Sequence, residues 1–275
     1  MIKYLYIAIA FLTLASCEEV VDIPLTESPK RLVIDANINW EKDATGQSIG
    51  ENQKIKLTET TGFYETSIPV ATGAIVSITN DNTGESIVFK EEENSGIYVT
   101  DSFDPELNAD YTLNITYKGE EFTAQETMLP VANITAIEQA IVNVFGTDVI
   151  RVDFNFTDPI EEGNFYVNQI NYESEYITDT YRTYGDDVVN GNDNSVFVQD
   201  ENLKKGEEII LYFYGVSERY HNYLSLLLQQ ITSGGPFATP PAAVKGNCIN
   251  TTNPDKKPLG YFRLSEMFVS SYVVE

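Results

Sequence analysis

The side chain with the most specific predicted chemistry is the thiol of Cys17, which ends an apolar run that begins at Tyr4. The run is shorter than the roughly twenty residues of a membrane-spanning helix and has the length of a signal-peptide core. It closes on a bacterial lipobox made of Leu14, Ala15, Ser16 and Cys17. We therefore predict a lipoprotein signal peptide over residues 1–16 and a diacylglycerol on Cys17, against the alternative of an ordinary cleaved signal.

The second cysteine, Cys248, is the only thiol that remains once Cys17 carries lipid, so no intramolecular disulfide is expected. A catalytic cysteine normally has an imidazole beside it, and the single histidine lies well away from Cys248 in the sequence. We therefore interpret Cys248 as a structural, half-buried residue.

That histidine, His221, limits the catalytic mechanisms open to the chain. It falls near the polar side of a predicted helix, which favours a surface or hydrogen-bonding role over that of a general base. The HExxH, P-loop, GxGxxG and CxxC motifs are absent from the sequence, and paired carboxylates are too numerous to be specific. We expect a protein that is not an enzyme and carries no cofactor.

The segment 186–194 is rich in oxygen ligands and contains Asp186, Asp187 and Asp193. These three aspartates are the calcium candidates of the chain. The segment lacks the acidic alternation and the closing glutamate of an EF-hand loop. Asp, Asn and Gly are also the residues that any exposed turn favours, so we predict no metal site here.

Aromatic residues lie next to that segment, at Tyr176, Tyr181 and Tyr184, and Trp40 follows the first predicted strand. Aromatic side chains in exposed segments are typical contact residues for a sugar, a peptide or a protein partner. The alternative is that they cover the core or pack between domains. We take these four residues as the candidate contacts.

Charge restricts the partners of the chain. Its 275 residues include 42 acidic and 17 basic ones, which gives a net charge of −25. Such a surface repels phosphate backbones, so we expect no nucleic-acid partner. It is also repelled by anionic headgroups, so attachment to a membrane needs an anchor such as the lipid on Cys17. Residues 17–30 are acidic and contain two prolines, which is typical of a tether.

A period of two dominates the next hundred residues. Short alternating strands are predicted around Leu32, Ile55, Val76 and Leu113, and turn-like sequences separate them. No helical stretch interrupts them. We therefore predict an immunoglobulin-like β-sandwich over residues 31–130.

The remaining residues, 131–275, predict a second β-rich domain with one amphipathic helix near 218–232. Residues 150–156 alternate cleanly, and residues 207–216 predict a strand buried on both faces. The helix is indicated by Tyr220, Leu224 and Leu227 at helical spacing, with Ser217 as its N-cap. The fold class is thus mainly β, with one helix packed on a sheet.

The order of these segments resembles the Bacteroidota outer-membrane lipoproteins known as domain-of-unknown-function family 4249. The matching motifs follow the lipobox cysteine and its acidic stretch, at residues 32–38, 72–78, 96–98, 111–115, 220–224, 236–237, 246–247 and 259–262. Cys248 departs from the pattern, because a small or apolar residue is expected beside the Gly-Asn element. The family offers no agreed catalytic residues.

The resemblance implies a role outside catalysis. Such proteins look like lipoproteins encoded beside TonB-dependent receptors, and the acidic stretch after Cys17 is similar to the signal that exports them to the outer face of the outer membrane. We expect a lipid-anchored, surface-exposed component of a TonB-dependent receptor system that captures or gates a ligand. The alternative is a structural or adhesive surface module without a transport role.

Overall fold

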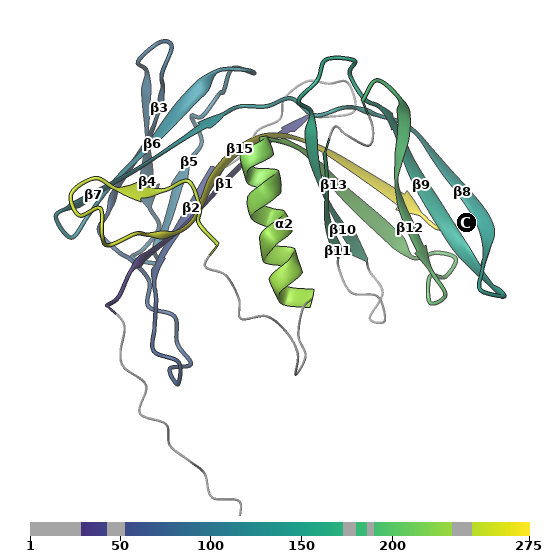
Figure 1. The fold of residues 1–275 in the computed structure, drawn as a ribbon, viewed down its shortest axis with the longest axis horizontal. Coiled ribbons are helices and arrows are strands. Elements are labelled where there is room, and N and C mark those ends of the chain that lie inside the picture. The colour runs from purple at the N-terminus through teal and green to yellow at the C-terminus, as the bar shows by residue number, and fades with distance from the viewer. Residues whose placement is uncertain (1–28, 43–52, 173–179, 186–189, 233–243) are drawn as a thin grey trace, which may run out of the picture.

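The computed structural model describes residues 29–42, 53–172, 180–185, 190–232 and 244–275. Within these residues two β-sandwiches stand side by side, and one helix, α2, lies between them (Figure 1). The predicted fold class is confirmed: the chain is mainly β, with an immunoglobulin-like N-terminal sandwich, a second β-rich part and one amphipathic helix. The second part is itself a sandwich.

From its own half of the chain, the N-terminal sandwich has three strands in one layer and four in the other. The first layer contains β1 (Leu32–Lys42), β2 (Gln53–Glu59) and β5 (Ile97–Thr100). The second contains β4 (Ser86–Glu91), β3 (Ile75–Asn80), β6 (Asp110–Tyr117) and β7 (Glu120–Thr127). A short pairing of β4 with β5 joins the two layers along one edge.

Alternation of apolar and polar residues builds the core of this sandwich, because successive side chains of a strand point to opposite faces. Ile55 and Leu57 of β2 and Leu113 of β6 are buried as their spacing predicts. The tyrosine Tyr98 is also fully buried. Its hydroxyl donates to the carbonyl of Ala71 at 2.9 Å, so its polar end is satisfied inside the core.

The second sandwich repeats the three-plus-four arrangement. Its three-stranded layer contains β12 (Asp193–Asp200), β9 (Thr147–Thr157) and β8 (Ile134–Val144). The facing layer contains β11 (Thr180–Tyr184), β10 (Phe165–Tyr172), β13 (Glu208–Val216) and the end of β15 (Leu259–Val273).

The second core is aromatic. The ring centroid of Phe213 lies 4.9 Å from that of Phe156 and 5.0 Å from that of Tyr166. One polar residue, Asn168, is fully buried on the same face of β10, and neither of its amide atoms has a hydrogen-bond partner among the residues that the structure describes. An amide buried without a partner destabilises the folded state, so Asn168 is a weak point of this core.

The long strand β15 belongs to both sandwiches. Its residues 259–268 pair in parallel with β1, from Val33↔Leu259 to Lys42↔Phe268. Its last residues pair antiparallel with β13, from Tyr214↔Met267 to Glu208↔Val273. The two-residue strand β14 (Ile249–Asn250) likewise pairs with β7. Residues 247–268 therefore return to the N-terminal sandwich, and the division predicted at residue 130 separates the halves in sequence but not in strand pairing.

Three glycines allow the backbones to approach closely where the two halves meet. A Cβ atom added to Gly260 would lie 1.9 Å from the carbonyl oxygen of Ile34, and one added to Gly215 would lie 1.8 Å from that of Pro130. A Cβ added to Gly246 would lie 1.6 Å from the carbonyl oxygen of Gly260. Any side chain at these positions would force the strands apart.

Helix α2 (Glu218–Thr232) packs on the outer face of the second sandwich. It begins as predicted, because the Ser217 hydroxyl accepts a hydrogen bond from the amide of Tyr220 at 3.2 Å. Tyr220 and Leu224 pack against Tyr214 of β13, whose other face fills the second core, so β13 is buried on both sides as predicted. No helix among the described residues is long and apolar enough to cross a membrane.

Candidate functional site

The side chains of β15 divide between the cores and the helix. Phe262 and Leu264 lie in the core of the N-terminal sandwich. Tyr261 and Arg263 alternate with them and point the other way. The Tyr261 ring lies 5.0 Å from the ring of Tyr220 and 4.8 Å from that of Tyr223 on α2. The helix therefore rests on the strand that joins the two sandwiches.

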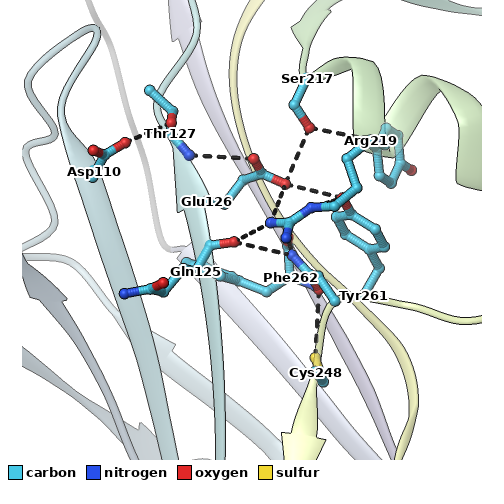
Figure 2. A network of polar contacts seen from close by, with 11 residues as sticks. Asp110, Gln125, Glu126, Thr127, Ser217, Arg219, Cys248, Tyr261 and Phe262 are labelled. Atoms are coloured by element: carbon cyan, nitrogen blue, oxygen red, sulfur yellow. Dashed lines mark hydrogen bonds and ion pairs between the residues drawn. The ribbon is translucent and has the colours of Figure 1, made fainter.

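A buried carboxylate, Glu126 of β7, connects the N-terminal sandwich to this helix (Figure 2). It is 7% exposed. Its Oε2 atom accepts hydrogen bonds from the hydroxyls of Tyr261 at 3.1 Å and Ser217 at 3.2 Å. The Arg219 guanidinium lies 3.7 Å from the same oxygen and also donates to the carbonyl of Gln125. One acid thus holds the start of α2 against two different strands.

The surroundings of Glu126 shift its titration. Burial raises the pKa of its carboxyl above the ordinary value of 4.5, and the Arg219 charge together with the hydrogen bonds opposes that rise. Burial also raises the pKa of Tyr261. The hydroxyls of Ser217 and Tyr261 and the guanidinium of Arg219 all meet the same carboxylate, so the network ties the start of α2 to β7 and β15.

A second buried charge, Arg263, ties β15 to β1. It is 6% exposed. Its Nε donates to the Asn37 Oδ1 at 3.2 Å, and its Nη1 donates to the Ser265 Oγ at 2.7 Å. The guanidinium carbon lies 4.7 Å from the ring centroid of Tyr214 and 5.2 Å from that of Tyr220. The arginine therefore links β1, β15, β13 and α2 through hydrogen bonds and cation–π contacts.

Beside α2, the residues that the structure describes leave part of the outer face of the second sandwich exposed. The residues Tyr181, Gln169, Tyr212 and Val269 are in register across β11, β10, β13 and β15 and so share one face. Asn171 adjoins them and accepts a hydrogen bond from the Gln169 Nε2 at 2.9 Å. We call this set the tyrosine strip: Gln169, Asn171, Tyr181, Tyr212 and Val269. Aromatic rings mixed with amides on a rigid sheet suit contact with a sugar or a peptide.

The four candidate contact residues are not brought together. Tyr181 is 47% exposed and belongs to the tyrosine strip. Tyr184 points to the opposite face of β11, where it packs against the second core. Trp40 packs against the core of the N-terminal sandwich. Tyr176 lies outside the described residues. For Trp40 and Tyr184 the structure favours the alternative of core packing.

The calcium candidates divide in the same way. Asp186 and Asp187 lie outside the described residues, as do Cys17 and its lipobox. Asp193 accepts a hydrogen bond from the Thr157 hydroxyl at 2.7 Å and borders a pocket of about 410 Å³ that also involves Asn155 and Ser195. Among the described residues no group of three or more His, Cys, Asp or Glu side chains is placed to hold a metal ion.

The two residues interpreted as structural have structural surroundings. His221 places its Nδ1 atom 2.7 Å from the Thr183 hydroxyl, and its ring lies 5.2 Å from that of Phe165, which confirms a hydrogen-bonding role. Cys248 is 8% exposed, and burial raises the pKa of its thiol to about 12. A thiol with that pKa is not a nucleophile at neutral pH.

Sequence reasoning missed Glu126, Arg219 and Arg263, because their partners are far away in the chain. Arg263 alone left a signal: it is a charge inside the apolar run of β15. A charged residue at a position that the pattern buries indicates a partner from another strand.

Comparison with protein families gives one decisive match. The model of the family described as "Domain of unknown function (DUF4249)" matches residues 18–267. The chain belongs to the DUF4249 family. The matched range contains the N-terminal sandwich, α2 and all of the second sandwich except the last residues of β15. No curated protein is significantly similar to the chain in sequence.

Two of the solved structures that are similar to this DUF4249 chain are multidomain segments of chicken proteins, one of them a fibronectin type III segment. A two-domain segment of chicken tenascin is 12% identical, over 70% of this chain and 92% of that one, with a TM-score of 0.23. The FN1–FN3 domains of chicken CNTN1 are 12% identical, over 66% of this chain and 57% of that one, with a TM-score of 0.28. TM-scores this low carry no argument about the fold, so the topology described above rests on the strand pairing of this chain alone.

Proposed function

We propose that this DUF4249 chain is a non-enzymatic lipoprotein on the outer face of the outer membrane, where it serves a TonB-dependent receptor system as a binding or accessory component. The lipobox at Cys17, the acidic stretch behind it and membership of the family support this proposal. The ligand is a small molecule, a peptide or a glycan that it captures or gates.

The observation that carries the proposal is the tyrosine strip on a rigid support. The strip lies on the four-stranded layer that contains the end of β15, and the start of the same strand belongs to the N-terminal sandwich. Helix α2 borders the strip. A partner that contacts Tyr181 and Gln169 therefore meets a surface that needs no ordering on binding. Preorganised aromatic anchors of this kind provide most of the binding energy in protein interfaces.

The test is a pull-down of the tagged, lipidated protein from its own outer membrane in mild detergent, followed by mass spectrometry. We expect stoichiometric recovery of a large β-barrel receptor. The variant Tyr181→Ser should reduce that recovery about tenfold, which corresponds to the loss of one anchor residue. Phe145→Ser, at a fully exposed hairpin tip between β8 and β9, is the matched control and should leave the recovery unchanged.

Recovery of the lipoprotein alone would contradict the receptor role. The same two sandwiches, joined rigidly by β15, would then serve as a structural or adhesive surface module. In that case deletion of the gene should alter cell attachment without an uptake defect.

A further inference from the structure

The loop between β2 and β3 exposes an aromatic pair that nothing in the described structure covers. Phe63 is 84% exposed and Tyr64 is 68% exposed, and their rings meet edge to face with centroids 5.2 Å apart. Ile68, on the returning side of the loop, is 68% exposed. Large apolar side chains gathered at a loop tip indicate an interaction surface.

The base of this loop is well ordered by backbone pairing. The amide of Glu59 donates to the carbonyl of Pro69 at 2.9 Å, and Thr58 forms a β-bridge with Val70. The loop therefore leaves the sandwich as a paired arm with Phe63 and Tyr64 at its tip. Such an arm holds its tip away from the core at low conformational freedom.

The arm starts beside the point where the chain joins β1. The amide of Thr60 donates to the carbonyl of Arg31 at 2.9 Å, and the amide of Arg31 donates to the Thr60 hydroxyl at 3.0 Å. Figure 1 shows the arm and the start of β1 at the same end of the N-terminal sandwich. The residues that precede Arg31 lead directly to Cys17.

Distances set by chain length place a membrane within reach of the tip. Cys17 precedes Arg31 by 14 positions, so even a fully extended chain would place the two no more than about 50 Å apart. The five or so residues from the base of the arm to its tip span about 15 Å when extended. A bilayer that holds the lipid on Cys17 therefore lies within about 50 Å of Arg31, beside which the arm starts.

We propose that Phe63, Tyr64 and Ile68 insert into the headgroup region of the bilayer that carries the lipid of Cys17. The inference rests on the proposed lipid anchor. Tyrosine and phenylalanine at the water interface of a membrane bury an apolar ring while the tyrosine hydroxyl stays hydrated. The contact needs no positive charge, which suits an acidic protein, and the anchor supplies the high local concentration that a weak contact requires. The tip then fixes the orientation of the two sandwiches on the membrane.

The experiment uses the lipidated full-length chain in vesicles of phosphatidylethanolamine and phosphatidylcholine. A Gly62→Cys variant carries an environment-sensitive fluorophore beside the aromatic pair, where the nearest side chain apart from the chain neighbours is the flexible end of Glu65, in ordinary contact at 3.8 Å from the added Cβ. A Glu85→Cys variant carries it in the turn at the opposite end of β3. The native Cys248 is buried, and the Cys17 thiol is blocked by its lipid, so neither competes for the label.

We expect the fluorophore at position 62 to shift to the blue and to resist an aqueous quencher, whereas the fluorophore at position 85 does neither. Adding Phe63→Ser and Tyr64→Ser should reduce the shielded fraction about tenfold while the protein still floats with the vesicles. Equal quenching at both positions on floated protein would overturn the inference and leave the lipid anchor intact. Shielding that develops only when a receptor is present would overturn it in favour of a protein contact, and failure to float would overturn both proposals.

Discussion

Substitution of Gly260 by alanine tests the close approach of β15 to β1. The new Cβ would lie 1.9 Å from the carbonyl oxygen of Ile34, so the strands would have to separate by more than about 1 Å. Gly260 also has a φ of +94°, which costs a residue with a side chain about 1–2 kcal/mol. Adding the lost packing and ladder hydrogen bonds, we expect a loss of about 4–6 kcal/mol in the free energy of unfolding.

Two other glycines separate the cost of the steric clash from the cost of the positive φ. Gly206 has a φ of +92° and open space around it, so Gly206→Ala should lose only the backbone part, about 1–2 kcal/mol. Gly246 lacks the positive φ but has the same kind of clash, with the Cβ 1.6 Å from the carbonyl oxygen of Gly260. Its alanine variant should therefore lose about 3 kcal/mol or more.

Urea unfolding followed by far-ultraviolet circular dichroism measures the three variants against the parent chain, and thermal melting provides an independent check. At about 2–4 °C per kcal/mol for a chain of this size, Gly260→Ala should lower Tm by more than about 8 °C and Gly206→Ala by only a few degrees. Equal losses for Gly206→Ala and Gly260→Ala would refute the reasoning, because the steric contact would then contribute nothing.

Three further predictions concern buried polar groups. Because the raised pKa of Glu126 makes the folded state hold a proton that the unfolded state releases, its contribution to stability is present at low pH and is lost as pH rises above about 4.5. Glu126→Gln should therefore show a smaller fall in urea midpoint than the parent between pH 4 and pH 8, and parallel curves would contradict this. Asn168→Leu should raise the free energy of unfolding by about 1–2 kcal/mol, because it removes an amide without partners, and a loss of stability would show that the amide is satisfied. Cys248 should resist alkylation at pH 8 until urea unfolds the chain, whereas rapid reaction of the native protein would contradict its burial and its pKa of about 12.

Local features of this fold were predictable because their causes are local. The alternation in β2 and β6, the apolar stripe of α2 and the cap at Ser217 depend on residues a few positions apart. Long-range pairing was not predictable in the same way. Nothing in the sequence around Asn37 indicates that its side chain meets Arg263, which is 226 positions later.

The candidate site shows the same limit. Tyr181 and Tyr184 are close in sequence, and both were predicted as contact residues. The pleat of β11 directs Tyr181 to the tyrosine strip and Tyr184 to the second core. The strands that fix the register of β11 in its sheet come from residues 165–172 and 208–216. A chain of acidic and aromatic residues predicts contacts in general, and only the assembled sheet shows which ones remain open.

The family motifs gain a physical explanation in the junction. The Gly-Asn element at residues 246–247 places the Asn247 side chain on both backbone groups of Phe262: its Oδ1 accepts from the amide at 2.8 Å, and its Nδ2 donates to the carbonyl at 2.7 Å. Gly246 lies against Gly260 of the Gly-Tyr-Phe element. The two late motifs thus contact each other and hold residues 246–247 against β15, which neither motif indicates alone.

The double membership of β15 also constrains the order in which the chain folds. The N-terminal half cannot complete its first layer before residues 259–273 are in place, because β1 lacks its parallel neighbour until then. The second half waits as well, because β13 lacks its neighbour until the same segment appears. Contacts this distant in sequence slow folding and leave strand edges exposed to other chains. The arrival of this one strand covers the open edges of β1 and β13 together, so the last segment of the chain protects both halves from pairing with other chains.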